Sequence, residues 1–373
     1  MQTPPISSHW QHVRVGHPLH LNVRDAEGTL LLARGQVITS AAQLEALKER
    51  GVWFDSNAVR TTAAQVQHAP PEQLPALWGH CMDSVAHALR TSQQEHFRAA
   101  LDDAAVPVIA LIERDPDLAI FQVVRQQAGA LTEYGVNHSV HAAITSRLVA
   151  QRLGWDQAQL GSVFKAALTM NLSMLELQGW LATQVTPLTA LQRDAIRSHP
   201  ARSVEMLEKS GISDRDWLTA VAQHHEKPDG SGYPGRLREV SDIAALLRRV
   251  DIYTAKLSPR STRSAIAANR AGREIFMQDP EHPMNNAIVK EFGVYPPGCF
   301  VLLASGETGV VVRRGASANT PIVASLTDRK GAPLAEPLRR DTATSEHLVV
   351  DVVPEHSLQV RVSDEKLALL AAA

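Results

Sequence analysis

Cysteine is scarce in this chain of 373 residues, which contains only Cys81 and Cys299, far apart in the sequence. Two isolated cysteines exclude a disulfide-stapled scaffold and a cysteine–zinc site, and they suit a reducing compartment. No apolar run approaches the roughly 20 residues of a membrane-spanning helix. The N-terminal stretch MQTPPISSHWQHVRV also lacks the basic and apolar parts of a secretory signal. We therefore expect a cytoplasmic protein without a membrane span.

The chain also lacks an excess of charge of either sign, because its formal net charge is -2 with neutral histidines. A nucleic-acid-binding face needs a basic excess, so nucleic acid is not an expected partner. Hydrophobic residues make up 44% of the chain and charged residues 20%, which is typical of a globular protein with a sizeable core. Histidine is the unusual count, with 16 residues, several of them in the middle third.

The N-terminal third divides into a small module and a connecting region. Residues 1–60 hold two short apolar runs around a turn signal at 25–28, followed by a helix that Thr39 or Ser40 caps and Gly51 ends, which predicts an α/β module. Residues 61–114 are predicted to be a linker, rich in Ala, Gln and Pro over 61–75, and then helices that Pro107 interrupts and Pro116 bounds.

The rest of the chain changes from helical to β-rich patterns. Residues 115–295 are dominated by helical periodicity, and residues 296–373 hold β-rich runs split by glycine turns, which predict a β-meander and a tail. The stretch LGSVFKAALTMNLSMLELQGWL is apolar almost all round and predicts one buried helix. The stretch LTALQRDAIRSHPARSVEMLEKSG predicts two short helices, the second beginning at Pro200. The expected fold class is mainly α.

Five side chains of the helical region are candidate metal ligands: His138, His199, His224, His225 and Asp251. Adjacent side chains on a helix point about 100° apart, so His224 and His225 can reach one centre only at a helix end. Asp251 lies in an apolar helix, where an unpaired carboxylate would be costly. Imidazole and carboxylate together suit iron, manganese or zinc. The alternative for each histidine taken singly is an ordinary hydrogen-bonded residue.

A glycine-rich turn, DGSGYPG, follows the histidine pair almost directly. Gly230 and Gly232 permit positive φ angles and let backbone N–H groups approach an anion closely. The side chain of Asp229 can fix the turn, Tyr233 offers a flat face and a hydroxyl, and Pro234 stiffens the exit. These features suit a nucleotide phosphodiester, whereas the alternative is a surface turn followed by a packed tyrosine.

The stretch HHEKPDGSGYP resembles the signature of the HD-GYP domain, whose active members hydrolyse cyclic di-GMP at a di- or tri-iron or manganese centre. The segments NHSV, LTALQRDAIRSHPARSVEML and RRVDIYTAKLSPRSTR are similar to family segments in the expected order, so the resemblance covers about residues 115–272. Residues 10–55 are similar to a module that precedes some such domains. The resemblance implies an HD-superfamily helical bundle, a role in bacterial signal transduction, the five metal ligands above, and a substrate loop formed by Asp229, Gly230, Gly232, Tyr233 and Pro234.

The resemblance breaks at the motif that names the superfamily. Active members have His-Asp-x-Gly-Lys where this chain has MNLSM, residues 170–174. The neutral amide of Asn171 cannot supply the charge of a bridging carboxylate, and the thioether of Met170 suits iron or manganese poorly. Met174 removes a lysine that would assist at the phosphate. Tyr134 stands where trinuclear members carry a glutamate, and Thr254 stands where an aspartate is common.

These departures predict a degenerate active site. Without the bridging carboxylate we expect one divalent transition metal (iron, manganese or zinc) held by His199, His224 and His225, and no binuclear centre. Three functions are then open. The chain could be a catalytically impaired module that binds cyclic di-GMP or docks a partner, an active cyclic di-GMP phosphodiesterase with an unusual mononuclear site, or a scaffold for diguanylate cyclase-type signalling proteins.

Overall fold

The computed structural model describes residues 23–24, 30–32, 36–49, 53–54, 61–125, 133–354 and 362–372, and it divides into two compact units, Met1–Thr61 and Thr62–Ala373. In the first unit, β1 (Val23–Arg24), β2 (Leu30–Leu32) and β3 (Trp53–Phe54) form an antiparallel sheet in the order β2-β1-β3. Helix α1 (Ala41–Glu49) follows Ser40, whose Oγ accepts from Gln43 N at 3.2 Å. The α/β module is confirmed, while the predicted turn at 25–28 and the helix end at Gly51 lie outside the described residues.

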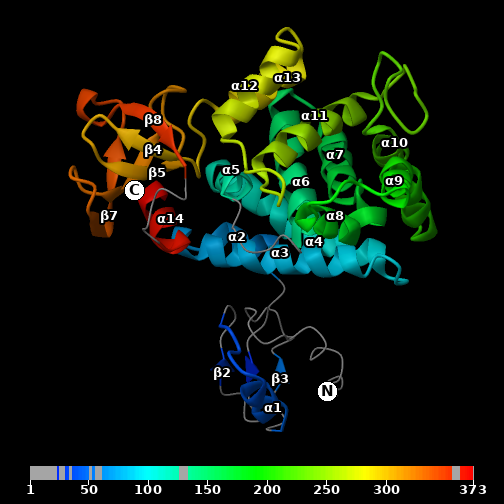
Figure 1. The fold of residues 1–373 in the computed structure, drawn as a ribbon, viewed down its shortest axis with the longest axis horizontal. Coiled ribbons are helices and arrows are strands. Elements are labelled where there is room, and N and C mark those ends of the chain that lie inside the picture. The colour runs from blue at the N-terminus through cyan, green and yellow to red at the C-terminus, as the bar shows by residue number, and fades with distance from the viewer. Residues whose placement is uncertain are drawn as a thin grey trace. The chain divides into compact units, whose positions relative to one another are not determined.

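Helices make up most of the second unit (Figure 1). They are α2 (Ala63–His68), α3 (Leu74–Arg90), α4 (Phe97–Arg114), α5 (Pro116–Val124), α6 (Tyr134–Arg152), α7 (Gln157–Thr169), α8 (Leu175–Thr183), α9 (Ala190–Lys209), α10 (Arg215–Gln223), α11 (Asp242–Leu257), α12 (Ala268–Gln278) and α13 (Pro283–Phe292). The short 3₁₀ turns η3 (Pro71–Gln73) and η5 (Leu172–Met174) precede α3 and α8. Helix α6 is buried along nearly its whole length, so the bundle forms around it. The mainly α fold class is confirmed.

Two helices continue through prolines that the sequence predicted to break them. Pro107 lies within α4, and Pro200 lies within α9, which is one helix where two were expected. A proline removes one N–H···O bond of the helix and leaves the carbonyl four residues earlier without its donor. In α9 that carbonyl belongs to Ile196, and it accepts a hydrogen bond from Nδ1 of His199 at 2.6 Å. The freed acceptor is thus satisfied, and the helix continues.

Two further sequence predictions were wrong. Residues 61–75, predicted as a linker, contain α2, which a Thr62–Gln65 capping box begins and Arg114 holds by donating to the carbonyls of its last turn and C-cap. The apolar stretch at 160–181, predicted as one helix, breaks between α7 and α8, where Asn171 leaves helical geometry. Asparagine favours such breaks because its side chain competes with helical hydrogen bonding, and apolar periodicity carries no signal of this kind.

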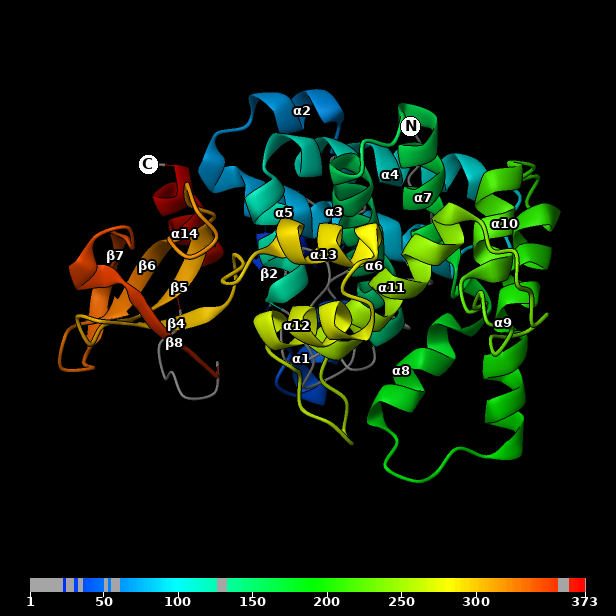
Figure 2. The same cartoon turned by 90° about the horizontal axis from the view of Figure 1, so that it is seen from above.

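Five antiparallel strands form the C-terminal sheet in the order β7-β6-β5-β4-β8. They are β4 (Phe300–Leu303), β5 (Thr308–Arg313), β6 (Ile322–Thr327), β7 (Pro333–Asp341) and β8 (Val349–Val353). Strands β4 to β7 follow one another as a meander, and β8 returns to pair with β4. Side chains alternate between two faces, so Phe300 and Val310 join the helical core while Val301 and Val311 form a second cluster. Helix α14 (Asp364–Ala372) packs on β5 and on α3, which completes the unit (Figure 2).

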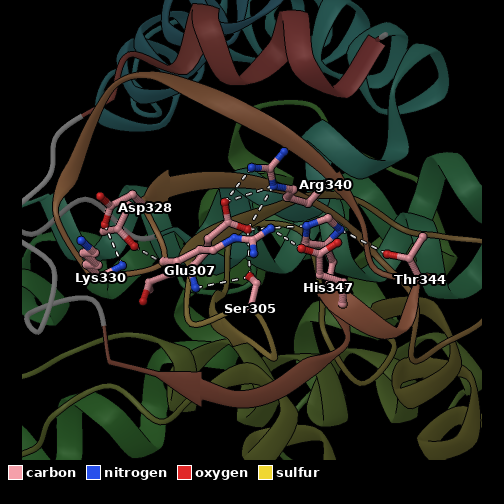
Figure 3. A network of polar contacts seen from close by, with 11 residues as sticks. Ser305, Glu307, Asp328, Lys330, Arg340, Thr344 and His347 are labelled. Atoms are coloured by element: carbon pink, nitrogen blue, oxygen red, sulfur yellow. Dashed lines mark hydrogen bonds and ion pairs between the residues drawn. The ribbon is translucent and has the colours of Figure 1, made fainter.

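A buried carboxylate, that of Glu307, stabilises this sheet by hydrogen bonds. Glu307, which is 3% exposed, follows the turn after β4 and receives hydrogen bonds from Arg340 of β7, the shortest at 2.6 Å, and from Ser305 Oγ at 2.8 Å (Figure 3). The hydrogen bond from Arg340 holds the pKa of Glu307 below its ordinary value. Because both oxygens of the carboxylate accept hydrogen bonds within the sheet, the cluster stabilises the fold.

Arg314, directly after β5, joins the sheet to the helices. Its Nε donates to Asp117 of α5, and its Nη1 donates to Glu291 of α13 at 2.8 Å. Glu291 also forms an ion pair with Arg152 at the end of α6. The side chains of Asp117 and Glu291 are 14% and 8% exposed, and among the described residues Arg314 is the one cation that compensates the charge of both carboxylates.

We predict that Arg314→Met lowers the free energy of unfolding by about 2 to 3 kcal/mol, because it leaves two poorly solvated carboxylates with less counter-charge. Urea unfolding followed by circular dichroism measures this change. Arg313→Met is the matched control, since Arg313 is 54% exposed and lies 3.8 Å from Asp117. Arg313→Met should lower the free energy of unfolding by less than about 1 kcal/mol. Equal losses in the two variants would contradict the assignment.

Candidate functional site

Two imidazoles are oriented by backbone carbonyls that lack helical partners. His199 Nδ1 contacts Ile196 O at 2.6 Å, and His224 Nδ1 contacts Val221 O at 2.7 Å, where α10 ends. A carbonyl oxygen can only accept, so each Nδ1 carries the proton and donates. In a neutral ring this arrangement leaves Nε2 with a free lone pair, the form in which histidine binds a metal.

The two Nε2 lone pairs face each other. The Nε2 atoms of His199 and His224 are 3.0 Å apart, and both rings are buried. Burial, with a smaller contribution from His224, lowers the pKa of His199 to about 3, and burial likewise lowers the pKa of His224. Opposed lone pairs of two neutral rings repel each other unless a cation lies between them. Adjacent ligand atoms on an ion with bonds of about 2.1 Å lie roughly 3 Å apart, so this separation fits one shared metal ion.

His225 completes a cluster of three imidazoles. The candidate ligand atoms of His199, His224 and His225 all lie within 4.8 Å of one another. Helix α10 ends at Gln223 and His224 is its C-cap, so the chain turns there and two adjacent rings converge, which is the geometry that the sequence position predicts. Burial, followed by the neighbouring His224, lowers the pKa of His225 well below its ordinary value. This all-nitrogen donor set fits a divalent transition metal.

The other two predicted ligands pair with each other. His138 of α6 and Asp251 of α11 lie with Nε2 and Oδ1 2.8 Å apart. Burial alone would raise the pKa of Asp251, but the hydrogen bond and charge of His138 and the charges of the neighbouring histidines hold it below its ordinary value. Asp251 also acts electrostatically on His224 and His225, so the pair lies beside the cluster. Binding of metal by these five residues stays a prediction.

The segment that replaces the His-Asp motif contributes no charge. Met170 is fully buried in the core, and Met174 is half-buried. Asn171 is 1% exposed, and its Nδ2 has no hydrogen-bond partner among the described residues. Ser173 ties the segment to α9, because its Oγ donates to His199 O at 3.0 Å and its N donates to Ser203 Oγ at 3.2 Å. The segment therefore supports the backbone of His199 and supplies no carboxylate that could bridge two ions.

The loop after the histidine pair is organised by carboxylates that accept backbone N–H groups. Glu226 Oε1 accepts from Gly235 N at 2.5 Å, and its Oε2 accepts from Leu237 N at 3.0 Å. Asp229 Oδ1 accepts from Ser231 N at 2.8 Å, the turn-fixing role that the sequence predicts. Gly230 has a φ of 76°, which favours glycine.

Tyr233 lies on the imidazole cluster. Its ring stacks on His225, with centroids 4.5 Å apart and planes 23° apart, and its N donates to His225 O at 3.2 Å. Gly232 does not use the positive φ that glycine permits, and its role is steric. A Cβ there would lie 2.5 Å from both Glu226 Cα and Lys227 N, so no side chain fits. Pro234 is exposed at the outer end of the loop.

Sequence reasoning assigned no role to two residues of this region, Glu226 and Arg260. Arg260 Nη2 donates to Tyr134 OH at 2.7 Å, its guanidinium lies 5.0 Å from the centroid of that ring, and Tyr134 stacks on His138. Tyr134 thus holds a cation beside the site. The only sequence signal for Glu226 was its place within the HHEKPDGSGYP stretch, and Arg260 had none that separated it from other surface arginines.

Comparison with known proteins adds to this geometry. Residues 122–276 match the family model of the HD domain. Cyclic di-GMP phosphodiesterase PA4108 of Pseudomonas aeruginosa is 28% identical over 232 residues, 60% of this chain and 55% of the relative. The 3'3'-cGAMP-specific phosphodiesterase 3 of Vibrio cholerae is 26% identical over 230 residues, 61% of this chain and 46% of the relative. The matches thus span about half the length of these curated relatives.

A solved structure shares the fold. Bd1817, an HDG"Y"P protein from Bdellovibrio bacteriovorus, superposes with a TM-score of 0.53 at 15% identity, covering 74% of this chain and 96% of that chain. The chain is an HD-GYP domain protein. Among the described residues of this HD-GYP protein, no helix is both long enough and apolar enough to cross a membrane.

We predict that Gly232→Ala in this HD-GYP protein weakens zinc binding roughly tenfold or more, because the added methyl group displaces the loop and lifts Tyr233 from His225. Competition with a chromophoric chelator measures the affinity. Gly161→Ala is the control, since a Cβ at this position of α7 would meet no atom within 4 Å. Wild-type zinc affinity in Gly232→Ala would show that the loop does not support the imidazoles.

Proposed function

We propose that this HD-GYP protein is a cyclic di-GMP signalling module that binds the dinucleotide at a single-metal site and hydrolyses it slowly or not at all. The observation that carries the proposal is the convergence of His199, His224 and His225 beside a motif segment without a carboxylate. The names of the two curated relatives, which act on cyclic di-GMP and on 3'3'-cGAMP, support a cyclic dinucleotide as the ligand class.

The charges of the site favour a phosphodiester. An ion held by the three imidazoles would supply Lewis-acid charge to a phosphodiester oxygen. Arg260, held by Tyr134 close to His138, adds a second positive group that can donate hydrogen bonds to phosphate. Tyr233 covers one face of His225 and restricts the access of water on that side.

The same residues argue against rapid hydrolysis. A two-metal phosphodiesterase activates water between two cations and stabilises the leaving oxygen with the second of them. The amide of Asn171 cannot bridge cations as a carboxylate does, and His138 is engaged with Asp251. Loss of one such electrostatic element costs about 10² to 10³ in rate, so turnover should fall at least that far below that of an intact enzyme.

Calorimetric titration of cyclic di-GMP into the full chain tests the proposed function. We expect binding with zinc or manganese present, and at least roughly tenfold weaker binding after chelation, because the ion contributes charge at the phosphate. A parallel assay with manganese or ferrous iron measures product formation. Turnover at the rate of an active enzyme would favour a mononuclear phosphodiesterase instead, and no binding under any condition would reject the ligand.

Restoring a carboxylate at position 171 tests the single-metal part of the proposal. We predict that Asn171→Asp lowers the melting temperature in chelator, because it buries a charge, and that manganese restores stability as bound metal rises above one equivalent. Asn171→Leu is the control and should not respond to manganese beyond the wild type. One equivalent in Asn171→Asp, with no stabilisation by manganese, would contradict the role assigned to the missing carboxylate.

A further inference from the structure

Glu226 differs from the other buried carboxylates of the helical and sheet regions. It is 1% exposed, yet no arginine, lysine or histidine of the described residues forms an ion pair with it. Glu291 and Glu307 pair with arginines, and Asp251 pairs with His138. A buried carboxylate without a counter-ion must be compensated by hydrogen bonds. In Glu226 these come from the N–H groups of Gly235 and Leu237.

These hydrogen bonds close the loop on itself. The backbone N of Glu226 donates to Gln223 O at 2.8 Å, which fixes this residue to the end of α10. Its side chain then reaches the chain nine and eleven residues further on. Between these two points, Gly232 packs against the backbone of 225–227, and Tyr233 bonds and stacks on His225. One carboxylate therefore joins both ends of the segment that carries Tyr233.

Apolar burial does not order the outer half of this loop. Pro234, Gly235 and Arg236 are exposed, and the side chain of Leu237 is 41% exposed. A segment with so little buried apolar surface is ordered by its hydrogen bonds. Two charge-assisted bonds to one carboxylate are the strongest of these, because bonds to ionised acceptors are roughly twice as strong as neutral ones.

We propose that Glu226 is a positioning residue that pre-forms the 226–237 loop and thereby holds His225, beneath Tyr233, in the orientation that binds metal. The effect on the loop stands on the described contacts alone, and the effect on metal rests on the proposed function. Pre-forming the loop means that a ligand does not have to order it on binding, which preserves affinity.

Glu226→Gln in the full chain tests the proposal. Glutamine keeps the size of the side chain, but it offers one oxygen acceptor and turns an NH₂ group toward the second N–H. We expect the amide protons of Gly235 and Leu237 to exchange at least about tenfold faster in the apo protein, as measured by NMR. Zinc affinity should fall about 10- to 100-fold, and the visible spectrum of the cobalt-substituted protein should change.

Glu239→Gln is the matched control, because Glu239 is an exposed carboxylate of the same region. This variant should leave amide exchange, zinc affinity and the cobalt spectrum as in the wild type. Wild-type exchange rates in Glu226→Gln would overturn the proposal, and so would accelerated exchange with unchanged zinc affinity and cobalt spectrum.

Measurements on the wild type keep the proposal testable if the variant does not fold. The amides of Gly235 and Leu237 should then exchange at least about tenfold more slowly than that of Arg238 in the same apo protein. Equal rates would reject the pre-formed loop. These measurements distinguish failure of the loop proposal from failure of the proposed function. If the wild type bound neither zinc nor cyclic di-GMP, the proposed metal site would be rejected, while the amide-exchange result for the loop would still stand.

Discussion

Two backbone carbonyls without amide donors determine the chemistry of the imidazole cluster. One is freed by Pro200 inside α9, and the other belongs to the last turn of α10. Each carbonyl accepts a hydrogen bond from the protonated Nδ1 of a histidine. The unprotonated Nε2 of that ring therefore faces the Nε2 of the other ring. The tautomers of His199 and His224 thus follow from main-chain geometry, and neither ring needs a carboxylate to orient it. The segment MNLSM at 170–174 contains no carboxylate, and the orientation of the two rings does not require one there.

The residues around the cluster hold it in place without a carboxylate from the segment 170–174. Ser173 holds the 170–174 segment to α9 by hydrogen bonds, and Met170 fills space in the core. Tyr134 stacks on His138 and accepts a hydrogen bond from Arg260, which keeps this guanidinium near the imidazoles. Beside the candidate metal position of the three imidazoles, the guanidinium of Arg260 is a further positive group.

Much of the fold and part of the site were predictable from the sequence. Helical and β-rich regions are distinct in composition, and the paired histidines before DGSGYPG indicated a helix end with two converging rings. The course of α9 could not be predicted, because the side chain that satisfies Ile196 O is that of the residue beside the proline itself. The role of Glu226 in the loop could not be predicted, because its partners are backbone N–H groups up to eleven positions away, and these leave no pattern of residue types. The break at Asn171 could not be predicted from hydrophobic periodicity, because the stretch on both sides of it is apolar almost all round.

The contacts of Arg314 extend beyond the sheet. Through Glu291 they reach Arg152, the last residue of the helix that also carries His138. Excising residues 122–276, the stretch that matches the HD domain, would remove Phe300 and its neighbours from the shared core and separate Arg152 from Glu291. In this protein the family-matched segment therefore shares its hydrophobic core with a β-structure that begins more than twenty residues after the match ends.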